Sequence, residues 1–182
     1  MIKTAIVNVV MTASLNQTLD FDEIRKFREI FHDTEVYGGR VAYFKTSNMG
    51  GRVSLFPSGK MISVGTRSEK RAFSELNQAM RFLVQIGSIK KVKLNPKTQN
   101  IVATADLEAC ISLEELFRRT RGIYEPEQFP GLILRIEDPY KATILVFASG
   151  KIVIAGLKNS EQIIPTAKRL EKIIKNSVDD KT

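Results

Sequence analysis

The sequence predicts an α+β fold in which two pseudo-symmetric repeats form one curved antiparallel sheet with helices on a single, convex side. Two observations predict it: a long internal repeat, and the order of strand and helix patterns within each copy. Residues 147–156, FASGKIVIAG, are echoed 91 positions earlier by residues 56–65, FPSGKMISVG. Each copy reads as an apolar strand, a Ser-Gly turn and a second apolar strand, which is typical of a β-hairpin. A self-match at so long a period indicates a duplicated unit.

The first repeat, residues 1–90, is predicted to contain two helices among its strands. Thr4–Ala13 is rich in β-branched and apolar residues, as a strand is. Asp20 can cap a helix over Phe21–Phe31, where apolar residues recur at helical spacing. Ser68 precedes a second helix, and Gly87 is a natural stop for it. Further strands are expected over residues 40–45 and 52–56 and in the hairpin.

The second repeat, residues 91–182, replays this order. Ser112 is expected to cap a short helix over Leu113–Arg121. Pro165 is tolerated only in the first turn of a helix, so the last helix is predicted to begin near Ile164. Strands are expected over residues 100–105, 132–136, 143–147 and 151–155. The linker at residues 87–96 is too short to separate independent domains, so one continuous, intertwined domain is expected.

The hairpin strands are apolar on both faces. Side chains alternate across a strand, so Leu145 and Phe147 share one face while Ile144 and Val146 share the other. Two helices per repeat can cover only one face of the strands. The other would be a large exposed apolar surface, and such surfaces usually mark binding sites. Two occupants stay open at this point: a ligand, or a second copy of the chain in a homodimer.

Asn8 and Asn100 interrupt the first strand of each repeat at equivalent places. A carboxamide in an apolar strand needs a hydrogen-bond partner, and for either residue alone a bond to buried backbone is the simpler interpretation. Two such residues on an exposed apolar face instead suit a ligand with approximate two-fold symmetry. Duplex DNA is such a ligand, and its minor groove presents acceptors on A and T bases.

The composition favours a polyanionic partner, nucleic acid first. Lys and Arg number 28 against 20 for Asp and Glu, giving a formal charge of +8. The single cysteine, Cys110, excludes an intramolecular disulfide and fits a reducing compartment. No apolar run approaches the length of a membrane span. We therefore expect a soluble, cytoplasmic protein without a membrane partner.

No catalytic constellation is recognisable, so an enzyme is not predicted. His32, the one histidine, is interpreted as a surface or capping residue, and Cys110 as a buried, inert thiol. The sequence contains no zinc-ligand spacing, phosphate-binding loop or hydrolase nucleophile motif. We expect no cofactor and no metal.

The chain resembles the TATA-box-binding protein family, in particular an archaeal-type core, over roughly Ile6–Ile174. The most specific segments are QNIVATADL at residues 99–107, YEPEQFPGLILRIEDP at 124–139 and FASGKIVIAG at 147–156. The resemblance implies a saddle-shaped sheet and a transcription initiation factor. Such a factor binds A·T-rich, TATA-like promoter DNA in the minor groove, bends it and recruits transcription factor B. It also implies association with the nucleoid.

The resemblance further assigns roles to individual residues. Asn8 and Asn100 are expected to bond base edges, and Phe129 and Phe147 to act as a pair of wedges, with Phe56 as a single wedge in the first repeat. The implied DNA-binding set is Asn8, Val10, Thr12, Lys45, Phe56, Ser58, Lys60, Ile62, Asn100, Val102, Thr104, Phe129, Arg135, Leu145, Phe147, Ser149, Lys151 and Val153. The implied contacts to transcription factor B are Glu125, Glu127 and Gln128.

The first repeat departs from the family pattern. The second wedge would stand 17 residues before Phe56, where this chain has Gly39. The loop of the first repeat is therefore interpreted as shortened and lacking a phenylalanine, with Tyr37 as the candidate substitute. Lys45 stands for an arginine and Ser54 for an apolar residue. These departures predict a firm kink beside Phe147 and a weaker one beside Phe56. The alternative function is a diverged paralogue, a protein-interaction modulator or competitor of initiation with weak DNA bending.

Overall fold

The computed structural model describes residues 2–178 and divides into two compact units. The first unit is Asn8–Gln99, and the second joins the residues up to Val7 to those from Asn100 onward. The units thus divide inside the first strand of each repeat, at positions 7/8 and 99/100. The division of the sequence into repeats at 90/91 stays a prediction about the duplication, and each unit is described separately below.

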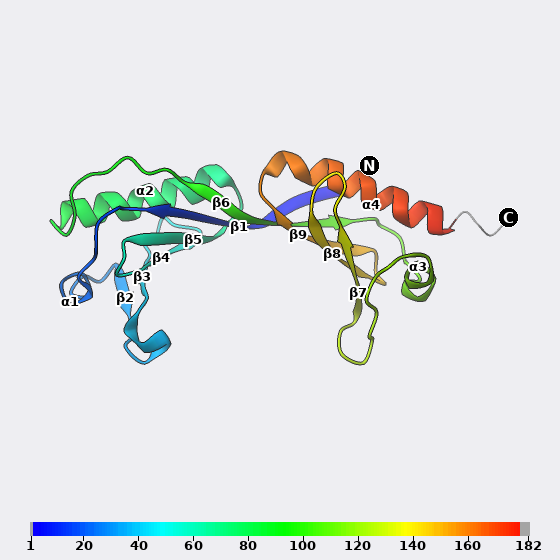
Figure 1. Cartoon of the computed structure of the whole chain (residues 1–182), viewed down its shortest axis with the longest axis horizontal. Helices are drawn as coiled ribbons and strands as arrows, with labels where there is room; N and C mark the ends of the chain where they lie inside the picture. The colour runs from blue at the N-terminus through cyan, green and yellow to red at the C-terminus, as the bar shows by residue number, and fades with distance from the viewer. Residues whose placement is uncertain (1, 179–182) are drawn as a thin grey trace. The chain divides into compact units, whose positions relative to one another are not determined.

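The first unit is an antiparallel sheet in the order β2-β3-β4-β5-β1. Its elements are β1 (Lys3–Ser14, from Asn8 on), α1 (Phe21–Ile24), β2 (Ile30–His32), the 3-10 turn η1 (Val36–Gly39), β3 (Ala42–Phe44), β4 (Arg52–Leu55), β5 (Lys60–Thr66), α2 (Glu69–Gln85) and the beginning of β6 (Lys97–Asp106). The long helix α2 contacts β4 and β5, on one face of the strands (Figure 1).

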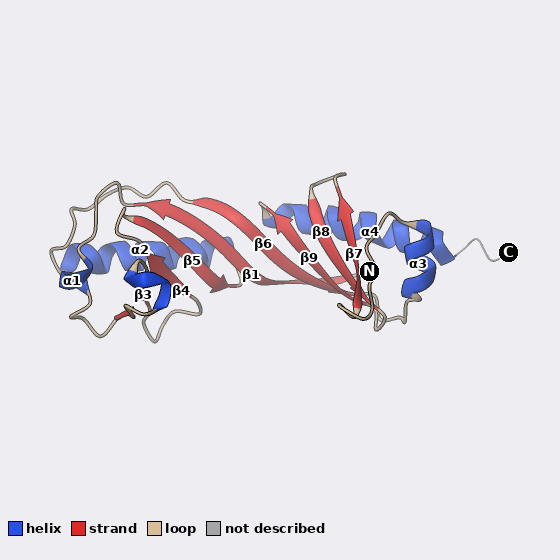
Figure 2. Cartoon of the chain, turned by 60° about the horizontal axis from the view of Figure 1, so that its bottom comes forward, coloured by secondary structure: helices blue, strands red, loops and turns tan. Residues whose placement is uncertain are grey.

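The second unit has the same plan, with strands in the order β6-β9-β8-β7. Besides β6 and the beginning of β1, its elements are α3 (Leu113–Arg119), β7 (Gly131–Ile136), β8 (Ala142–Phe147), β9 (Lys151–Leu157), the 3-10 turn η2 (Ser160–Gln162) and α4 (Ile163–Val178). Helix α4 contacts β9 and α3, behind the strands drawn in red in Figure 2. The antiparallel α+β class predicted from the sequence is confirmed.

Each unit has one covered and one open face, as the alternating pattern predicted. In β8 the side chains of Ile144 and Val146 are fully buried, whereas those of Leu145 and Phe147 are half-buried. The covered face receives the apolar stripe of a helix, which in α2 consists of Ala72, Leu76, Ala79, Met80 and Leu83. On the opposite face, apolar side chains such as those of Leu145 and Phe147 stay partly exposed.

The predicted helix over 21–31 is wrong beyond its first turn. Asp20 caps α1 as expected, with its side chain accepting from the Asp22 N–H, but the helix ends at Ile24. Ile30 instead begins β2, where it pairs with Phe44 of β3. Phe21, Ile24 and Ile30 are buried, so the apolar spacing correctly found core residues. Pairing with the sheet edge overrides the helical period here.

The other helix boundaries follow the sequence signals closely. Ser68 and Ser112 cap α2 and α3 through bonds to the N–H groups of Arg71 and Glu115. At the end of α2, Gly87 adopts a positive φ of 76°, and the Ser88 N–H bonds back to the Leu83 carbonyl at 3.0 Å. This is the glycine-terminated pattern expected of a Schellman motif. Pro165 lies in the first turn of α4.

Candidate nucleic-acid interface

Both predicted asparagines anchor to a backbone N–H within their own unit. The Oδ1 atom of Asn8 accepts from the Gly65 N–H at 2.8 Å, and that of Asn100 accepts from the Gly156 N–H at 2.8 Å. Both side chains are only half-buried. The backbone-bonded interpretation therefore describes the oxygen of each carboxamide correctly, and it leaves the nitrogen to be accounted for.

A β-bulge explains why each glycine offers its N–H to an asparagine. The register of β1 with β5 shifts between Val9 and Met11, so β5 has an extra residue at this point. Gly65 has a φ of 92°, and Gly156, at the matching shift between β6 and β9, has a φ of 101°. A bulge leaves ladder groups unpaired and favours glycine in this left-handed conformation. The asparagine supplies the missing acceptor.

The anchored oxygen fixes the orientation of each carboxamide. With Oδ1 held by the bulge glycine, the Nδ2 amino group of Asn8 or Asn100 is the free end of the side chain. Among residues 2–178 no acceptor for either Nδ2 is recorded, and neither nitrogen is buried without a partner. Each unit therefore presents one oriented N–H donor in an apolar strand. Acceptors on base edges are the complementary chemistry.

The open face of the second unit is a row of side chains that follows the strand register. Thr104 lies beside Val153, Val153 beside Leu145, and Leu145 beside Ile133. The first unit repeats the row with Thr12, Ile62, Ser54 and Tyr43. Val10 and Val102 share the parity of these threonines and are also half-buried. The structure thus brings the predicted strand residues of each repeat together on one face, with Ser54 interrupting the apolar character of the first unit.

The two predicted wedges of the second unit form one aromatic pair. The rings of Phe129 and Phe147 lie edge to face, 5.8 Å between centroids. Gly131, which pairs with Phe147 across β7 and β8, makes room for them. A Cβ at Gly131 would lie 2.8 Å from Phe129 Cε1 and 3.2 Å from Phe147 Cε1. The pair therefore needs a glycine beneath it as well as two phenylalanines.

The first unit lacks both parts of this arrangement. By the register of β3 and β4, Val41 takes the place opposite Phe56 that Gly131 takes opposite Phe147. Gly39 stands where the outer phenylalanine would be and has a φ of 68°, which disfavours any side chain there. Tyr37 is 73% exposed, with no ring contact recorded within the described residues, so its role as a substitute stays a prediction.

The loop of the first unit is not shortened, contrary to the sequence interpretation. Phe31 pairs with Tyr43 and Ile123 pairs with Ile133 at equivalent points. The connection from 32 to 42 is thus two residues longer than that from 124 to 132. The extra length is tied down by His32, whose Nε2 lies 2.8 Å from the Gly39 carbonyl. His32 is therefore a half-buried structural residue, packed against Phe21, and the surface interpretation is wrong.

The hairpin tips are clamped so that their polar side chains face outward. Gly59 and Gly150 adopt positive φ angles, and a Cβ at either would collide with backbone of the loop that follows β1 or β6. The Leu15 and Leu107 N–H groups bond to the carbonyls of these two glycines at 2.9 and 3.1 Å. The predicted contact residues Ser58, Lys60, Ser149 and Lys151 are all exposed at these tips. In the second unit a hollow of about 610 Å³ lies against the tip, lined among others by Thr104, Phe147, Ser149, Lys151 and Val153.

The cations predicted to contact phosphate are available for an anion. Lys45, Lys60, Arg135 and Lys151 are exposed, and within the described part of the chain no ion pair is recorded for any of them. Lys45 follows β3 at the position that Arg135 takes on β7. Unpaired cations beside an apolar strip suit a polyanion with apolar sugars and base edges.

The predicted partner-binding residues lie on the loop before β7. Glu125, Glu127 and Gln128 are exposed. The loop itself projects away from α4 (Figure 1). The Gln128 and Phe129 N–H groups both bond to the Glu125 carbonyl at 2.9 Å, which makes the loop a closed turn. At its base, burial raises the pKa of Tyr124, and a hydrogen bond to Glu114 raises it further.

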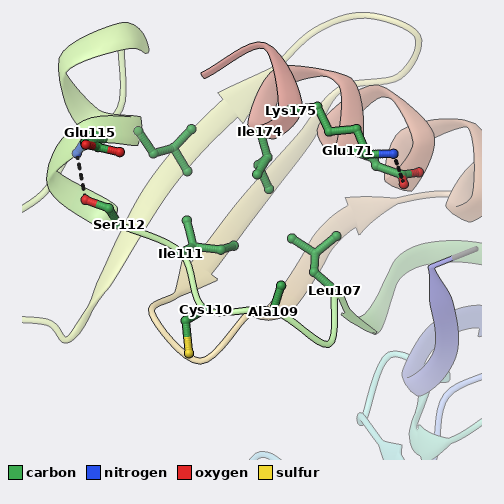
Figure 3. Close-up of a pocket in the computed structure, with 10 residues that line it drawn as sticks. Leu107, Ala109, Cys110, Ile111, Ser112, Glu115, Glu171, Ile174 and Lys175 are labelled. Atoms are coloured by element: carbon green, nitrogen blue, oxygen red, sulfur yellow. Dashed lines mark hydrogen bonds and ion pairs between the residues drawn. The ribbon is translucent and has the colours of Figure 1, made fainter. Parts of the chain in front are cut away.

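Cys110 is exposed, so its predicted burial is wrong. It lies at the rim of a hollow of about 510 Å³ between the loop after β6 and helix α4 (Figure 3). Its sulfur points away from the ion pair of Glu171 and Lys175, whose hydrogen bond lowers the pKa of Glu171. Among residues 2–178 no cluster of three or more His, Cys, Asp or Glu side chains is placed to hold a metal ion. No helix in this range is long and apolar enough to span a bilayer.

Sequence reasoning missed three residues on the open face of the first unit. Phe31, Tyr43 and Arg52 lie at or beside its strand row, with the Arg52 guanidinium 4.5 Å from the Tyr43 ring centroid. The alternation of Arg52, Ser54 and Phe56 along residues 52–56 is the signal that could have found Arg52. Phe31 could not be assigned to a strand face because its segment is predicted to be helical.

Fold and site together define an internally duplicated α+β protein whose antiparallel strands leave one apolar face open and carry one oriented asparagine in each unit. A family model described as transcription factor TFIID, or TATA-binding protein (TBP), matches residues 3–86 and 95–177. The chain belongs to this TATA-binding protein family.

Individual relatives agree with this membership. A TATA-box-binding protein of Cenarchaeum symbiosum is 42% identical over 87% of this chain and 86% of its own length. That of Pyrodictium occultum is 35% identical over 92% of this chain and 84% of its own length. The solved structure of Methanococcus jannaschii TBP matches with a TM-score of 0.84 at 31% identity, covering 96% of this chain and 99% of that chain.

Proposed function

We propose that this protein is a transcription initiation factor that binds A·T-rich, TATA-like promoter DNA in the minor groove, bends it and recruits transcription factor B. One observation carries the proposal most directly: the two bulge-anchored asparagines, each presenting a free Nδ2 donor from an otherwise apolar open face. The names of the relatives, TATA-box-binding proteins, support the same ligand.

The proposed mechanism combines base-edge bonds, apolar packing and deformation. The Nδ2 groups of Asn8 and Asn100 donate to the acceptors that A·T pairs present in the minor groove, while Val10 and Val102 pack beside them. The amino group of a guanine also lies in the minor groove, where it would face the Nδ2 donors and clash with them. A·T pairs are therefore favoured. The exposed lysines and Arg135 hold the phosphates and give affinity without sequence preference.

The wedges make the proposed bend unequal at its two ends. Phe129 and Phe147 bring two rings together at one place, whereas no ring contact of Phe56 is recorded among residues 2–178. Partial unstacking of a base step costs a few kcal/mol and is offset when bent DNA contacts more protein surface. We therefore expect a firm kink beside Phe147 and a weaker one beside Phe56.

The binding test uses an A·T-rich duplex labelled at both ends, read by gel shift and by fluorescence transfer for the bend angle. The Phe147→Ala variant should lose binding by about 10- to 100-fold and most of the bend, because it removes half of the paired wedge. Phe56→Ala should lose clearly less. Phe73→Ala, an exposed phenylalanine on α2, is the matched control and should change neither reading.

One outcome would contradict this function, and a second would contradict only the unequal bend. Absence of saturable binding by the intact chain, together with binding of transcription factor B in solution, would favour the protein-interaction modulator. A symmetric bend that is equally sensitive to Phe56 and Phe147 would refute the unequal grip. Sedimentation without DNA would show whether a homodimer covers the open face.

Recruitment of transcription factor B is assigned to the turn that holds Glu125, Glu127 and Gln128. Two exposed carboxylates on a closed turn suit a basic partner surface. Reversing both charges with Glu125→Lys and Glu127→Lys should abolish the ternary complex in a supershift while leaving the DNA complex intact. Retention of the ternary complex would place the partner site elsewhere. Glu23→Lys together with Glu161→Lys, two exposed carboxylates away from this turn, is the control for net charge.

A further inference from the structure

Three side chains on the open face of the first unit form a continuous stack, which we call the aromatic ladder. The rings of Phe31 on β2 and Tyr43 on β3 are stacked, with 6.4 Å between centroids and 25° between planes. The guanidinium carbon of Arg52 on β4 lies 4.5 Å from the centroid of the Tyr43 ring. Cation–π contact holds this guanidinium in place without consuming its charge.

The strand register places the ladder on the same face as the predicted contact residues. Phe31 pairs with Tyr43, Tyr43 with Ser54, and Ser54 with Ile62. Arg52 is two residues from Ser54 along β4 and therefore shares its face. The ladder is thus continuous with the proposed interface and extends it to the outer strand of the first unit.

The exposure of the ladder favours a ligand. The Phe31 side chain is 63% exposed, so its ring contributes little to the core, and Arg52 is exposed as well. No ion pair is recorded for Arg52 within residues 2–178. A large exposed aromatic side chain gives a monomer little stability, and exposed apolar surface usually marks a binding site. An aromatic ring beside a cation without an ion pair is suited to binding a nucleotide.

Within the described part of the second unit, the equivalent strand positions carry no counterpart to the ladder. The register places Ile123, Ile133 and Thr143 where the first unit has Phe31, Tyr43 and Arg52. Neither an aromatic ring nor a charge occupies these three places. The ladder therefore belongs to the same unit that lacks the second wedge and its supporting glycine.

We propose that the aromatic ladder binds the sugar–phosphate backbone of duplex DNA that flanks the A·T-rich element beyond Phe56, an inference that rests on the proposed function. Arg52 bonds a phosphate, and the edges of Phe31 and Tyr43 pack against the adjoining deoxyribose. Lys45, two residues after Tyr43, adds a second cation on the same face. This flanking contact strengthens the end of the complex where the single wedge grips least.

The test compares two duplexes by fluorescence anisotropy: one ending at the A·T-rich element, and one extended at both ends by a helical turn of about ten base pairs. On the extended duplex Phe31→Ser should lower the affinity about tenfold, as expected for loss of one aromatic contact to a nucleotide. Arg52→Ala should reduce the slope of log affinity against log salt by about 0.9, the value for one phosphate. Both effects should be much smaller on the short duplex.

The matched controls are Phe73→Ser and Arg81→Ala, an exposed aromatic and an exposed cation on α2. They change the same chemistry away from the open face and should bind both duplexes like the unchanged protein. Melting temperatures of all variants separate loss of binding from loss of folding. Phe31→Tyr, which keeps the ring, should restore affinity.

If the ladder variants bind the extended duplex like the unchanged protein while Phe147→Ala still loses binding, the ladder proposal is overturned and the proposed function stands. If the unchanged protein itself does not bind the duplex, both fall together. Variants that alter only the melting temperature would make the ladder a cross-strand stabilising contact. Variants that alter only sedimentation would make it a contact between copies. Either result overturns the assignment to DNA.

Discussion

At the scale of single residues, the carboxamides of Asn8 and Asn100 each have two roles, a structural one for the oxygen and a functional one for the nitrogen. The oxygen completes a bulge by accepting from Gly65 or Gly156, and the nitrogen is the part that remains for a ligand. Replacing the carboxamide by a carboxylate therefore removes only the nitrogen. A carboxylate still accepts from the glycine N–H, yet it offers no donor to a base and repels phosphate.

We predict that Asn100→Asp folds like the unchanged protein and loses about fivefold or more in affinity for A·T-rich DNA, since a base-edge contact is worth about 1–3 kcal/mol. Asn100→Ala should lose binding too, and should also unfold more easily by about 1 kcal/mol because the Gly156 N–H loses its acceptor. Urea unfolding and gel shifts measure the two effects separately. Undiminished binding by the Asp variant would refute the donor role.

The sequence predicts that a given side chain needs a hydrogen-bond partner better than it predicts which residue that partner is. The polarity of Asn8 in an apolar strand was visible, and so was the need for a hydrogen bond. The partner was not, because Gly65 lies 57 positions away and a bulge depends on the register between two strands. Cys110 and His32 show the same limit: their burial depends on loops whose paths local patterns do not specify.

At the scale of elements, the wedge is a property of a strand pair as much as of two phenylalanines. Gly131 on β7 lies opposite Phe147 on β8, and a Cβ there would meet both aromatic rings and the Val146 carbonyl, the last at 3.0 Å. The backbone of Gly131 has no positive φ, so alanine is conformationally acceptable at this position. The obstacles are therefore steric: the space that the two rings occupy, and the close approach of the Val146 carbonyl.

Gly131→Ala should therefore displace the phenylalanine pair while leaving the strand pairing in place. Overpacking of this kind costs about 1–3 kcal/mol in unfolding free energy, and the bend angle should fall with the displaced wedge. Gly50→Ala is the control, since a Cβ there meets only the flexible Arg71 side chain at 3.8 Å. Fluorescence transfer on the labelled duplex measures the bend, and an unchanged angle would show that the rings move without functional cost.

Elements with strong terminal signals could be predicted closely, whereas those recruited by the sheet edge could not. Helix α2 begins after Ser68 and ends before Gly87, as its caps indicated. The segment from Phe21 carries an equally good cap and apolar spacing, yet Ile30 pairs with Phe44 and the helix is reduced to one turn. A short helix gains little without tertiary contacts, so tertiary pairing decides in such a case.

At the scale of the whole chain, the duplication is plain in the sequence. The two repeats differ at more positions than the sequence alone indicated. The missing phenylalanine at Gly39 was visible by counting from Phe56. The valine in place of the supporting glycine became visible only with the register of β3 and β4, and the longer loop only with the pairing of Phe31 and Tyr43. Repair of the first repeat must therefore change the loop and its support together.

A loop graft tests this requirement. Replacing residues 32–41 by the sequence of residues 124–131, YEPEQFPG, supplies the outer phenylalanine, the glycine below it and the shorter connection at once, and leaves Ala42 in the strand. We predict that the graft increases the DNA bend and the affinity severalfold, because a second wedge pair lets more DNA contact protein. Gly39→Phe alone should give no gain, since the residue keeps a φ of 68° and Val41 still occupies the space for a ring. The fluorescence-transfer bend angle compares the two, with melting curves confirming that both variants fold. A gain from the single substitution equal to that of the graft would show that the loop and Val41 do not limit the first wedge.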